Sequence, residues 1–265
     1  MPVVCQIEPA CEATLRDAGL TTYEAFMTTT LGEALVKPGL EGRERIRLTL
    51  AEQTFYLKRY ALPARAGLES SAVRDVKNAG IRTMDLAATG AGPRGGFVMV
   101  TEVPGDALSR RFDELFQRFD GGPVVGEGLA RQLGELAGRL HRAGLFHRDL
   151  YADHIFVDVR GDELELYLID LARVFKPRHL RRWRWRLKDL AALKYSLPSD
   201  WTAVYWPTVL EAYTETLGRR LPPWAPLVLA VRLWRMKRHD ANPLKPREPV
   251  KRPILLECEN REMRG

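Results

Sequence analysis

The sequence predicts an α+β fold of two lobes, in which a mainly β N-terminal lobe precedes a mainly α C-terminal lobe. Up to Thr101 the apolar residues mostly alternate with polar ones or form short runs, whereas from Leu108 they mostly recur at helical spacing. The composition is that of a folded chain, because 45% of the 265 residues are hydrophobic and 28% are charged. We therefore expect an N-terminal lobe over residues 1–103 and a C-terminal lobe over residues 104–265.

The N-terminal lobe is expected to contain short helices, a meander of three strands, a longer helix and a buried strand. Ile46, Leu48 and Leu50 alternate with polar residues, as in a half-buried strand. Gly80 is a natural end for the helical spacing before it, because glycine accepts the left-handed conformation that follows many helices. The expected ranges are 8–28 for the short helices, 31–60 for the meander, 68–79 for the longer helix and 95–101 for the buried strand.

The C-terminal lobe is expected to begin at a hinge and to consist mostly of helices. Pro104 and Gly105 follow the buried strand, and this dipeptide marks a turn between the lobes. Leu129, Leu133 and Leu140 occupy one face of a predicted helix. The expected ranges are 108–119 and 126–143 for two helices, 155–159 and 165–169 for a strand hairpin, and 178 onward for helices interrupted by prolines.

The strongest motif is His147-Arg-Asp-Leu-Tyr-Ala-Asp-His154, which lies between a predicted helix and a predicted strand. Its first four letters match the H-R-D-L-x-x-x-N catalytic loop of protein kinases, and Asp170 follows Asp149 by 21 residues at a strand end. A His-Arg-Asp triplet alone is weak evidence, but the loop, the hairpin and the distal Asp together are specific. We expect a protein-kinase-like fold, with Asp149 as the base for a hydroxyl and Asp170 as a metal ligand.

The N-terminal lobe offers residues for a nucleotide. Lys58 lies on the third predicted strand, where a kinase lysine contacts the α- and β-phosphates, and Glu69 near the start of the next helix is placed to pair with it. At the hinge, the backbone of Glu102 and Val103 is expected to meet adenine, with Met99 or Val100 as the pocket wall. The loop at 38–42 contains two glycines but lacks the G-x-G-x-x-G pattern, so its contact with phosphates is weakly supported.

Positive charge is concentrated in two stretches of the C-terminal lobe. Residues 173–186 contain seven Lys/Arg and no acidic residue, and residues 219–252 contain ten Lys/Arg against two acidic residues, although the whole chain carries only +7. All six tryptophans lie at or beyond Trp183. This pattern indicates an anionic partner, such as a phosphorylated glycolipid or a membrane surface. Nucleic acid is not expected, because no nucleic-acid-binding motif is present.

Three segments of the chain resemble the bacterial lipopolysaccharide kinases, which include the Kdo kinases and the kinase of the first inner-core heptose. They are the loop 147–154, Leu-Ile-Asp-Leu-Ala-Arg at 168–173, and Arg-Arg-Trp-x-x-x-x-Lys-Asp-Leu-Ala-Ala-Leu at 181–193, and the similarity extends over about residues 30–240. In that family a tyrosine follows the fourth loop residue and a histidine replaces the asparagine, as Tyr151 and His154 do here. The resemblance favours heptose over Kdo.

The resemblance implies an ATP-dependent sugar kinase that acts on lipid-linked core oligosaccharide of lipopolysaccharide. It implies Mg²⁺, with Mn²⁺ as a substitute, and the same roles for Lys58, Glu69, Asp149 and Asp170. It further implies a cytoplasmic protein that lies peripherally on the inner membrane, in keeping with an N-terminus unlike a signal peptide. The basic residues that follow Asp170 are the candidates for acceptor contacts, namely Arg173, Lys176, Arg181 and Arg182.

The chain departs from the protein-kinase pattern in several places. His154 stands where asparagine is usual, so it is expected to ligate the metal or to hydrogen-bond a phosphate, and Asp153 is a substitute metal ligand. No A-P-E motif follows Asp170, which argues against a protein kinase. Asp189 is expected to support the catalytic loop, and His141 and His147 are expected to be structural.

Two other functions fit parts of the pattern. A kinase for a small cationic acceptor, such as an aminoglycoside-like antibiotic, would need an acidic pocket, whereas this C-terminal lobe is basic. A pseudokinase that binds a lipid or a partner protein is favoured by the poor glycine loop but opposed by the four intact residues of the predicted site. The segment from Trp224 to Arg238 is predicted to be either a membrane-surface helix or a helix packed on the lobe by its tryptophans. The sequence does not predict an oligomeric state.

Overall fold

The computed structural model describes residues 2–35, 43–177 and 182–240, so the predicted loop at 38–42 and Arg181 lie outside the described residues. The N-terminal lobe is built on a six-stranded antiparallel sheet with the order β1-β5-β6-β4-β3-β2. Its strands are β1 (Val4–Ile7), β2 (Glu33–Ala34), β3 (Arg43–Leu50), β4 (Gln53–Tyr60), β5 (Leu86–Gly92) and β6 (Gly95–Thr101).

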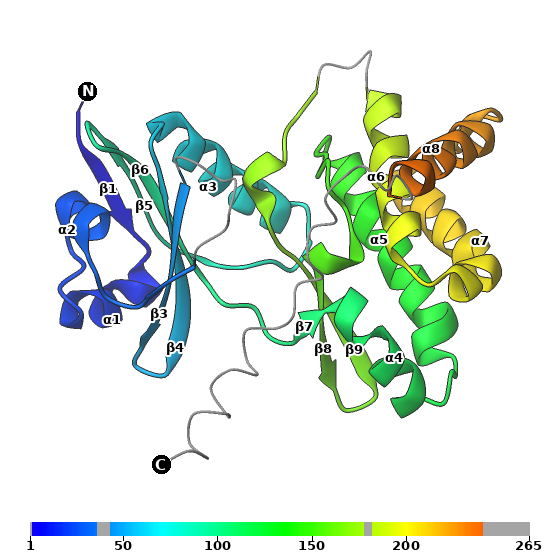
Figure 1. Ribbon diagram of the computed structural model, residues 1–265, viewed down its shortest axis with the longest axis horizontal. Helices are drawn as coiled ribbons and strands as arrows, with labels where there is room; N and C mark the ends of the chain where they lie inside the picture. Colours follow the sequence, from blue (N-terminus) through cyan, green and yellow to red (C-terminus); the bar gives the residue numbers. More distant parts are fainter. Residues whose placement is uncertain (1, 36–42, 178–181, 241–265) are drawn as a thin grey trace.

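The two faces of this sheet are covered by different helices (Figure 1). The short helices α1 (Glu12–Asp17) and α2 (Tyr23–Thr28) pack on one face, where Phe26 stacks on Phe97 with ring centroids 4.4 Å apart. The longer helix α3 (Pro63–Asn78) packs on the other face. Because side chains alternate along a strand, Leu57 faces α1 and α2, whereas Lys58 faces α3.

The structure confirms the α+β fold of two lobes and extends the longer predicted helix of the N-terminal lobe at its start. Helix α3 begins at Pro63, five residues before the predicted start, because proline suits the first turn of a helix. Glu69 therefore lies well inside α3, rather than near its start. Gly80 ends the helix in the left-handed conformation, at φ +72°, and its N–H donates to the carbonyl oxygen of Lys77.

The C-terminal lobe contains a three-stranded sheet and the larger group of helices. The sheet has the order β7-β8-β9, with β7 (Asp106–Ala107), β8 (Ile155–Arg160) and β9 (Glu163–Leu168). Helices α5 and α7 pack extensively on each other, and α8 packs on α6 at the outer side of the lobe (Figure 1). The helices are α4 (Leu108–Arg118), α5 (Leu129–Arg142), α6 (Arg182–Ser196), α7 (Ser199–Leu217) and α8 (Ala225–Asp240).

The end of β9 is attached to the N-terminal lobe. The Leu168 N–H donates to the carbonyl oxygen of Arg82 at 2.9 Å, and the Thr83 hydroxyl donates to the carbonyl oxygen of Leu168 at 2.5 Å. Lys176, beyond Asp170, forms an ion pair with Asp75 of α3 at 2.8 Å. We propose that the lobes divide at residues 1–103 and 104–265. In the described part of the chain, no helix combines the length and the apolar character needed to span a membrane.

Candidate active site

A buried ion pair joins β4 to α3. Lys58 Nζ lies 2.5 Å from Glu69 Oε1, and only 8% of Lys58 and none of Glu69 is exposed to solvent. The second oxygen of Glu69 accepts a hydrogen bond from the hydroxyl of Tyr60, which is on the same face of β4 as Lys58. Both oxygens of the carboxylate are therefore engaged, which offsets the cost of burying its charge.

The hinge is ordered by contacts of Glu102. Its N–H donates to the carbonyl oxygen of Thr54 at 2.9 Å, and its carboxylate accepts a hydrogen bond from the hydroxyl of Tyr56 at 2.6 Å. Burial, followed by this hydrogen bond, raises the pKa of Tyr56 to about 12. The Glu102 N–H is thus already used, so an adenine ring would have to meet the Glu102 carbonyl and the backbone of Val103.

The structure decides between the two residues predicted as the pocket wall. Met99 lies in the hydrophobic cluster beneath α1 and α2, with Phe26 and Phe97. Val100 belongs to the cluster on the α3 side of the sheet. Val100 is therefore on the face of the sheet that carries Lys58 and α3, whereas Met99 is on the opposite face, so the alternative of Met99 is wrong.

Asp189 of α6 holds the catalytic loop from below. Its fully buried carboxylate accepts hydrogen bonds from the N–H groups of His147 at 2.9 Å and Arg148 at 2.8 Å. Ring nitrogen Nε2 of His141 lies 3.2 Å from the same carboxylate, and Nδ1 lies 3.0 Å from the Tyr213 hydroxyl. The predicted structural roles of Asp189 and His141 are confirmed by these contacts.

His147 connects the catalytic loop to the end of β9. Its Nε2 lies 2.9 Å from the carbonyl oxygen of Ile169, which accepts only, so Nε2 carries the hydrogen. Burial lowers the pKa of His147, which keeps the ring neutral. The position of Asp149 in the loop is thereby coupled to the position of Asp170, which follows Ile169.

The residue before Asp149 adopts a strained backbone conformation. Arg148 has φ +73°, a left-handed conformation that is uncommon for a residue with a side chain. Three contacts maintain it: Asp189 accepts from its N–H, Lys188 Nζ donates to its carbonyl oxygen, and its guanidinium lies 5.6 Å from the Trp185 ring centroid. The backbone of the loop at Arg148 is therefore fixed through its N–H group, its carbonyl oxygen and its side chain.

Two cations flank the Asp149 carboxylate. Arg173 Nη1 lies 2.6 Å from Oδ2, and Lys188 Nζ lies 3.7 Å from Oδ1. The side chain of Asp149 is 20% exposed and that of Arg173 is 53% exposed, so this group is accessible to solvent. Burial lowers the pKa of Lys188, with Asp149 acting in the opposite direction. An oxygen that approached Asp149 would meet positive charge on both sides of the carboxylate.

His154 lies between the two carboxyl-bearing residues. Its Nδ1 is 2.7 Å from the backbone carbonyl oxygen of Asp149, and its Nε2 is 3.8 Å from Asp170 Oδ2. Because the carbonyl oxygen only accepts, Nδ1 carries a hydrogen, and Nε2 is the ring nitrogen on the side of Asp170. Asp170 itself has left-handed backbone angles (φ 55°, ψ 57°), which asparagine and aspartate tolerate better than most residues.

Arg45 of β3 contacts Asp170 from the face of the sheet that carries Lys58. Arg45 stands directly opposite Lys58 in the β3–β4 ladder, so the two side chains share one face of the sheet. Its Nη2 lies 3.9 Å from Asp170 Oδ1. The contacts therefore run from Asp149 through His154 and Asp170 to Arg45, which is the cross-strand neighbour of Lys58.

The donor set is compatible with a metal bound together with phosphates. Among the described residues, no group of three or more His, Cys, Asp or Glu side chains is arranged to hold a metal by itself. Mg²⁺ is usually held by one or two carboxylates and by phosphate oxygens, so the carboxylate of Asp170 fits such an ion. The lone pair of His154 Nε2 suits Mn²⁺ better than Mg²⁺, because imidazole is a softer ligand than oxygen.

Other predicted residues are placed away from this series of contacts. Asp153 accepts a hydrogen bond from the Ser109 hydroxyl of α4, and its role as a substitute metal ligand stays a prediction. Lys176 is paired with Asp75, as described above, and Arg182 is half-buried at the start of α6. Arg181 is not among the described residues.

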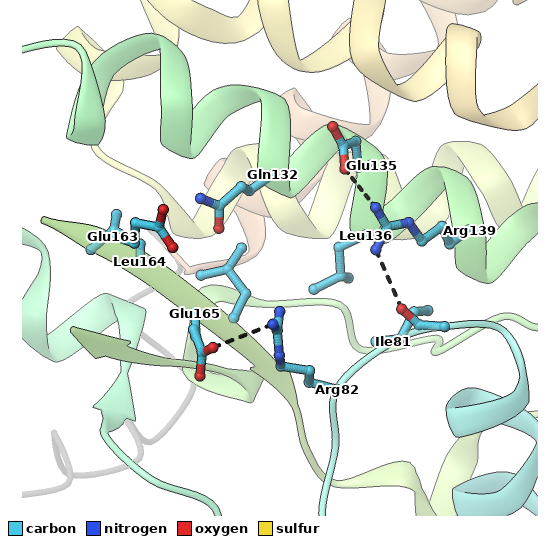
Figure 2. A pocket seen from close by; sticks show the side chains of 11 residues that line it. Ile81, Arg82, Gln132, Glu135, Leu136, Arg139, Glu163, Leu164 and Glu165 are labelled. Atoms are coloured by element: carbon cyan, nitrogen blue, oxygen red, sulfur yellow. Dashed lines mark hydrogen bonds and ion pairs between the residues drawn. The ribbon is translucent and has the colours of Figure 1, made fainter. Parts of the chain in front are cut away.

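A polar pocket lies outside this site (Figure 2). It is enclosed by the turn after α3, by α5 and by β9. Arg82 points to Glu165, with a closest distance of 3.3 Å, and Arg139 contacts Glu135 at 2.7 Å and the carbonyl oxygen of Gly80 at 3.3 Å. Its arginines are thus engaged within the protein, and none of the predicted site residues lines it.

The sequence interpretation missed Lys188 and Arg45. Asp189 was predicted to support the catalytic loop, and Lys188 directly precedes it. The sequence therefore contained a signal that Lys188 also lies near this loop. Arg45 alternates with the apolar residues of β3, which places it on the face opposite Ile46. Neither contact with an aspartate follows from spacing alone, because each is made between distant segments.

Comparison with known proteins identifies the relatives of this chain. The model of the lipopolysaccharide kinase (Kdo/WaaP) family matches residues 55–213. Lipopolysaccharide core heptose(I) kinase WaaP of Pseudomonas aeruginosa is 32% identical over 139 residues, which cover 48% of this chain and 51% of that protein. The match therefore spans about half the length of this curated relative.

Two solved structures show the same fold. The structure of WaaP in complex with acyl carrier protein superposes with a TM-score of 0.64 and 27% identity, over 90% of this chain and 98% of that one. An aminoglycoside-3′-phosphotransferase of type VIII superposes with a TM-score of 0.50 and 19% identity, over 85% of this chain and 98% of that one. At that identity the second likeness concerns the fold alone.

Proposed function

Because the chain belongs to the lipopolysaccharide kinase (Kdo/WaaP) family, we propose that it transfers phosphate from ATP to a sugar hydroxyl of the lipopolysaccharide core. The observation that carries this proposal is the position of His154, which contacts both the backbone of Asp149 and the side chain of Asp170. Heptose is the favoured sugar, because the 32%-identical relative is a core heptose(I) kinase, and Kdo is second.

The nucleotide is assigned to the cleft between β4 and the catalytic loop. Lys58 would contact the α- and β-phosphates, and Glu69 would hold its ammonium group in place. The carbonyl of Glu102 and the backbone of Val103 would meet adenine. These assignments are supported by the buried pair and by the use of the Glu102 N–H within the sheet.

Asp149 would accept a hydrogen bond from the acceptor hydroxyl and take its proton as the oxygen attacks the γ-phosphorus of ATP. The new bond joins the sugar oxygen to phosphorus, the bond from phosphorus to the β,γ-bridging oxygen breaks, and that oxygen departs with ADP. Asp170 and His154 would hold Mg²⁺ or Mn²⁺, which supplies charge neutralisation at the phosphates when bound. Lys188 would place a second positive charge beside Asp149, where it can stabilise the negative charge of the phosphoryl group during transfer.

The acceptor is assigned to the side of Asp149 that carries Arg173. The core region carries negative charge, which suits the cations that follow Asp170. Arg173 and Arg182 are the described candidates, and we retain Lys176 and Arg181 on the family resemblance. The lipid-linked acceptor would place the protein peripherally on the cytoplasmic face of the inner membrane.

The test is phosphate transfer from γ-labelled ATP to dephosphorylated core lipopolysaccharide in Mg²⁺, with Asp149→Ala as the matched inactive variant. We expect label on the glycolipid with the wild type alone. Parallel acceptors that carry Kdo only, or Kdo with heptose, distinguish the two sugars. Labelling of an aminoglycoside instead would support the small-acceptor alternative, and ATP binding without transfer to any acceptor would indicate a pseudokinase.

A further inference from the structure

We propose that the outer face of α8, together with Trp183 of α6, is a docking surface for an anionic lipid bilayer. This surface, here called the α8 surface, consists of Trp183, Trp224, Leu227, Val231 and Trp234. The proposal deepens the proposed function, on which it rests, by assigning the residues that would hold the protein beside a lipid-linked acceptor. The bilayer-docking surface and the catalytic residues are separate, so each can be tested without the other.

The two faces of α8 are occupied differently. Ala225 and Leu229 are buried against the rest of the lobe, whereas Leu227 is 69% exposed and Trp234 is 57% exposed. At about 100° per residue, Leu227, Val231 and Trp234 fall on one stripe, opposite the buried residues. Helix α8 is therefore apolar on both faces, although only one of them is covered by the protein. Of the two alternatives predicted for this segment, packing on the lobe is found, but it is made by Ala225 and Leu229 and not by the tryptophans, because Trp224 is 43% exposed and Trp234 is 57% exposed.

Aromatic rings extend the stripe at both ends. Trp224 lies just before α8 and meets Trp183 edge to face, with ring centroids 4.9 Å apart. The guanidinium of Arg238 lies over the Trp234 ring, 5.2 Å from its centroid. Tryptophan is favoured at the boundary between hydrocarbon and water, because the ring is apolar and its N–H is polar. Exposed aliphatic and tryptophan side chains on one helix face are the pattern of an interfacial helix.

The charge on this side of the molecule complements an anionic bilayer. Residues 182–188 and 225–239 contain no Asp or Glu, and the exposed cations beside the stripe are Arg184, Arg235, Lys237 and Arg238. Arg232, which is half-buried beneath them, has its pKa lowered by burial and then by its neighbours Arg184 and Arg235. Such crowding of like charge is relieved when anionic headgroups approach.

The α8 surface is connected to the catalytic loop through α6. Trp185, two residues from Trp183, meets the Phe175 ring edge to face at 4.9 Å, and its ring lies 5.6 Å from the Arg148 guanidinium. The beginning of α6 thus contacts the loop that carries Asp149 on one side and Trp224 on the other. A bilayer bound to the α8 surface would lie next to the lobe that receives the acceptor, which suits a substrate anchored in the same membrane.

A bilayer is favoured over a protein partner by the shape of this surface. The helix is 16 residues long, about 24 Å, and its stripe is a convex ridge flanked by cations. Protein interfaces usually combine a packed apolar centre with a polar rim, whereas the apolar residues of α8 form a single row with cations beside it. An acyl carrier protein, which is present in the similar WaaP structure, is the alternative occupant that the experiment must exclude.

The experiment is flotation of the full chain with vesicles made of equal parts of phosphatidylglycerol and phosphatidylethanolamine. We expect the wild type to float with these vesicles at low salt, to float less at high salt, and to stay in solution with phosphatidylcholine vesicles. The double variants Leu227→Ser with Trp234→Ser and Arg235→Glu with Arg238→Glu are each expected to lower the partition coefficient about tenfold. Asp149→Ala is expected to float as the wild type does, whatever its activity.

Matched controls replace exposed residues elsewhere. Leu68→Ser with Val204→Ser removes two comparably exposed aliphatic side chains, and Arg65→Glu with Arg142→Glu reverses two exposed charges, and both are expected to float as the wild type does. Equal partition of the α8 variants and the wild type would overturn the proposal. It would also be overturned if the wild type did not float and the α8 variants lost only binding to acyl carrier protein. Neither result would contradict the proposed function, because phosphate transfer can be measured separately with acceptor dissolved in detergent.

Discussion

The Lys58–Glu69 and Arg173–Asp149 ion pairs have nearly the same separation but opposite surroundings. The first is 2.5 Å long, and its side chains are 10% and 0% exposed. The second is 2.6 Å long, and its side chains are 53% and 20% exposed. Removing one partner from a buried pair leaves an uncompensated charge, whereas an exposed pair exchanges easily with water and with ions. The first pair is therefore a fixed part of the structure, whereas the second can exchange with solvent and, under the proposed function, would open to admit an acceptor.

The same contrast holds for two aspartates, Asp149 within the catalytic loop and Asp189 of α6, which supports the loop. Asp189 is buried and accepts hydrogen bonds from two backbone N–H groups, so it holds the loop. Asp149 is partly exposed and its side chain meets cations from two other segments. One carboxylate is committed to structure, while the other remains accessible to a substrate.

Replacing Asp149, the partly exposed carboxylate, is expected to have the largest effect on kcat. Asp149→Asn removes the proton acceptor, so kcat should fall by about 10³-fold, within the range seen for general bases. The affinity for ATP and the melting temperature should stay close to those of the wild type. Steady-state kinetics and nucleotide titration measure these quantities.

Asp153→Asn is the matched control for Asp149→Asn. Asp153 lies in the same loop and is exposed, but it accepts a hydrogen bond from Ser109. Its kcat should equal that of the wild type. A comparable loss in both variants would mean that the loop, rather than the carboxylate of Asp149, is responsible.

Replacing Glu69 tests the fixed side. Glu69→Gln leaves the ammonium group of Lys58 without its buried counter-charge, so the free energy of unfolding should fall by about 3 kcal/mol. The KM for ATP should rise as well, because Lys58 loses its orientation. Glu24→Gln, which breaks the exposed pair with Arg94 in the same lobe, should change stability by no more than about 1 kcal/mol. Similar losses in the two variants in urea denaturation would refute the distinction.

Much of the rigid part of the site, which comprises the Lys58–Glu69 pair and the loop held by Asp189, could be predicted from the sequence, because it is encoded in local patterns. The loop 147–154, Asp170 and Asp189 follow from motif spacing, and Lys58 follows from its place on a strand before a helix. The face on which Met99 lies could also have been predicted, because Met99 is two residues after Phe97 on the same strand and therefore points to the same side of the sheet. These features depend on neighbours along the chain or on the period of a strand.

The side-chain contacts of the partly exposed aspartates could not be predicted, because they join segments that are distant in the sequence. Lys188 reaches Asp149 from α6, Arg45 reaches Asp170 from β3, and Asp153 accepts a hydrogen bond from Ser109 of α4. The strands β1 and β5 were missed because β1 is short and β5 is rich in alanine and glycine, which are poor strand signals. Tertiary packing decided each of these cases.

Lys188 offers a smaller effect that sharpens the role of the cations. Lys188→Met should lower kcat about 10- to 100-fold with little change in KM for ATP, because the charge matters most as the phosphoryl group is transferred. Lys188→Arg should restore part of the rate. Lys194→Met, on the same helix and packed on Trp206, is the matched control and should keep the wild-type kcat. Failure of Lys188→Arg to restore any activity, with an unchanged Lys194→Met, would indicate a packing role instead.

Because of His147, we expect the free energy of unfolding to depend on pH. Burial lowers its pKa in the folded chain, whereas in the unfolded chain the ring titrates near its ordinary value of 6.5. Below that pH the unfolded state binds more protons, so the free energy of unfolding should fall as the pH is lowered from about 6.5. His147→Gln can donate to Ile169 without titrating and should remove this part of the slope, whereas His239→Gln at the surface should retain it. Urea denaturation over this pH range measures the slopes.

Arg173 gives the smallest effect and the most direct test of whether the accessible pair opens. Its pair with Asp149 is solvent-exposed, so Arg173→Gln should change the free energy of unfolding by less than about 1 kcal/mol. Once an acceptor hydroxyl displaces it from Asp149, the guanidinium is left beside the incoming anionic substrate. The KM for the acceptor should therefore rise by about two- to tenfold, more at low salt than at high salt, while the KM for ATP stays constant. Arg142→Gln, at an exposed position on α5, should leave both KM values unchanged. If Arg173→Gln instead lowers the melting temperature and leaves the acceptor KM unchanged, the two ion pairs do not differ in the way their exposure indicates.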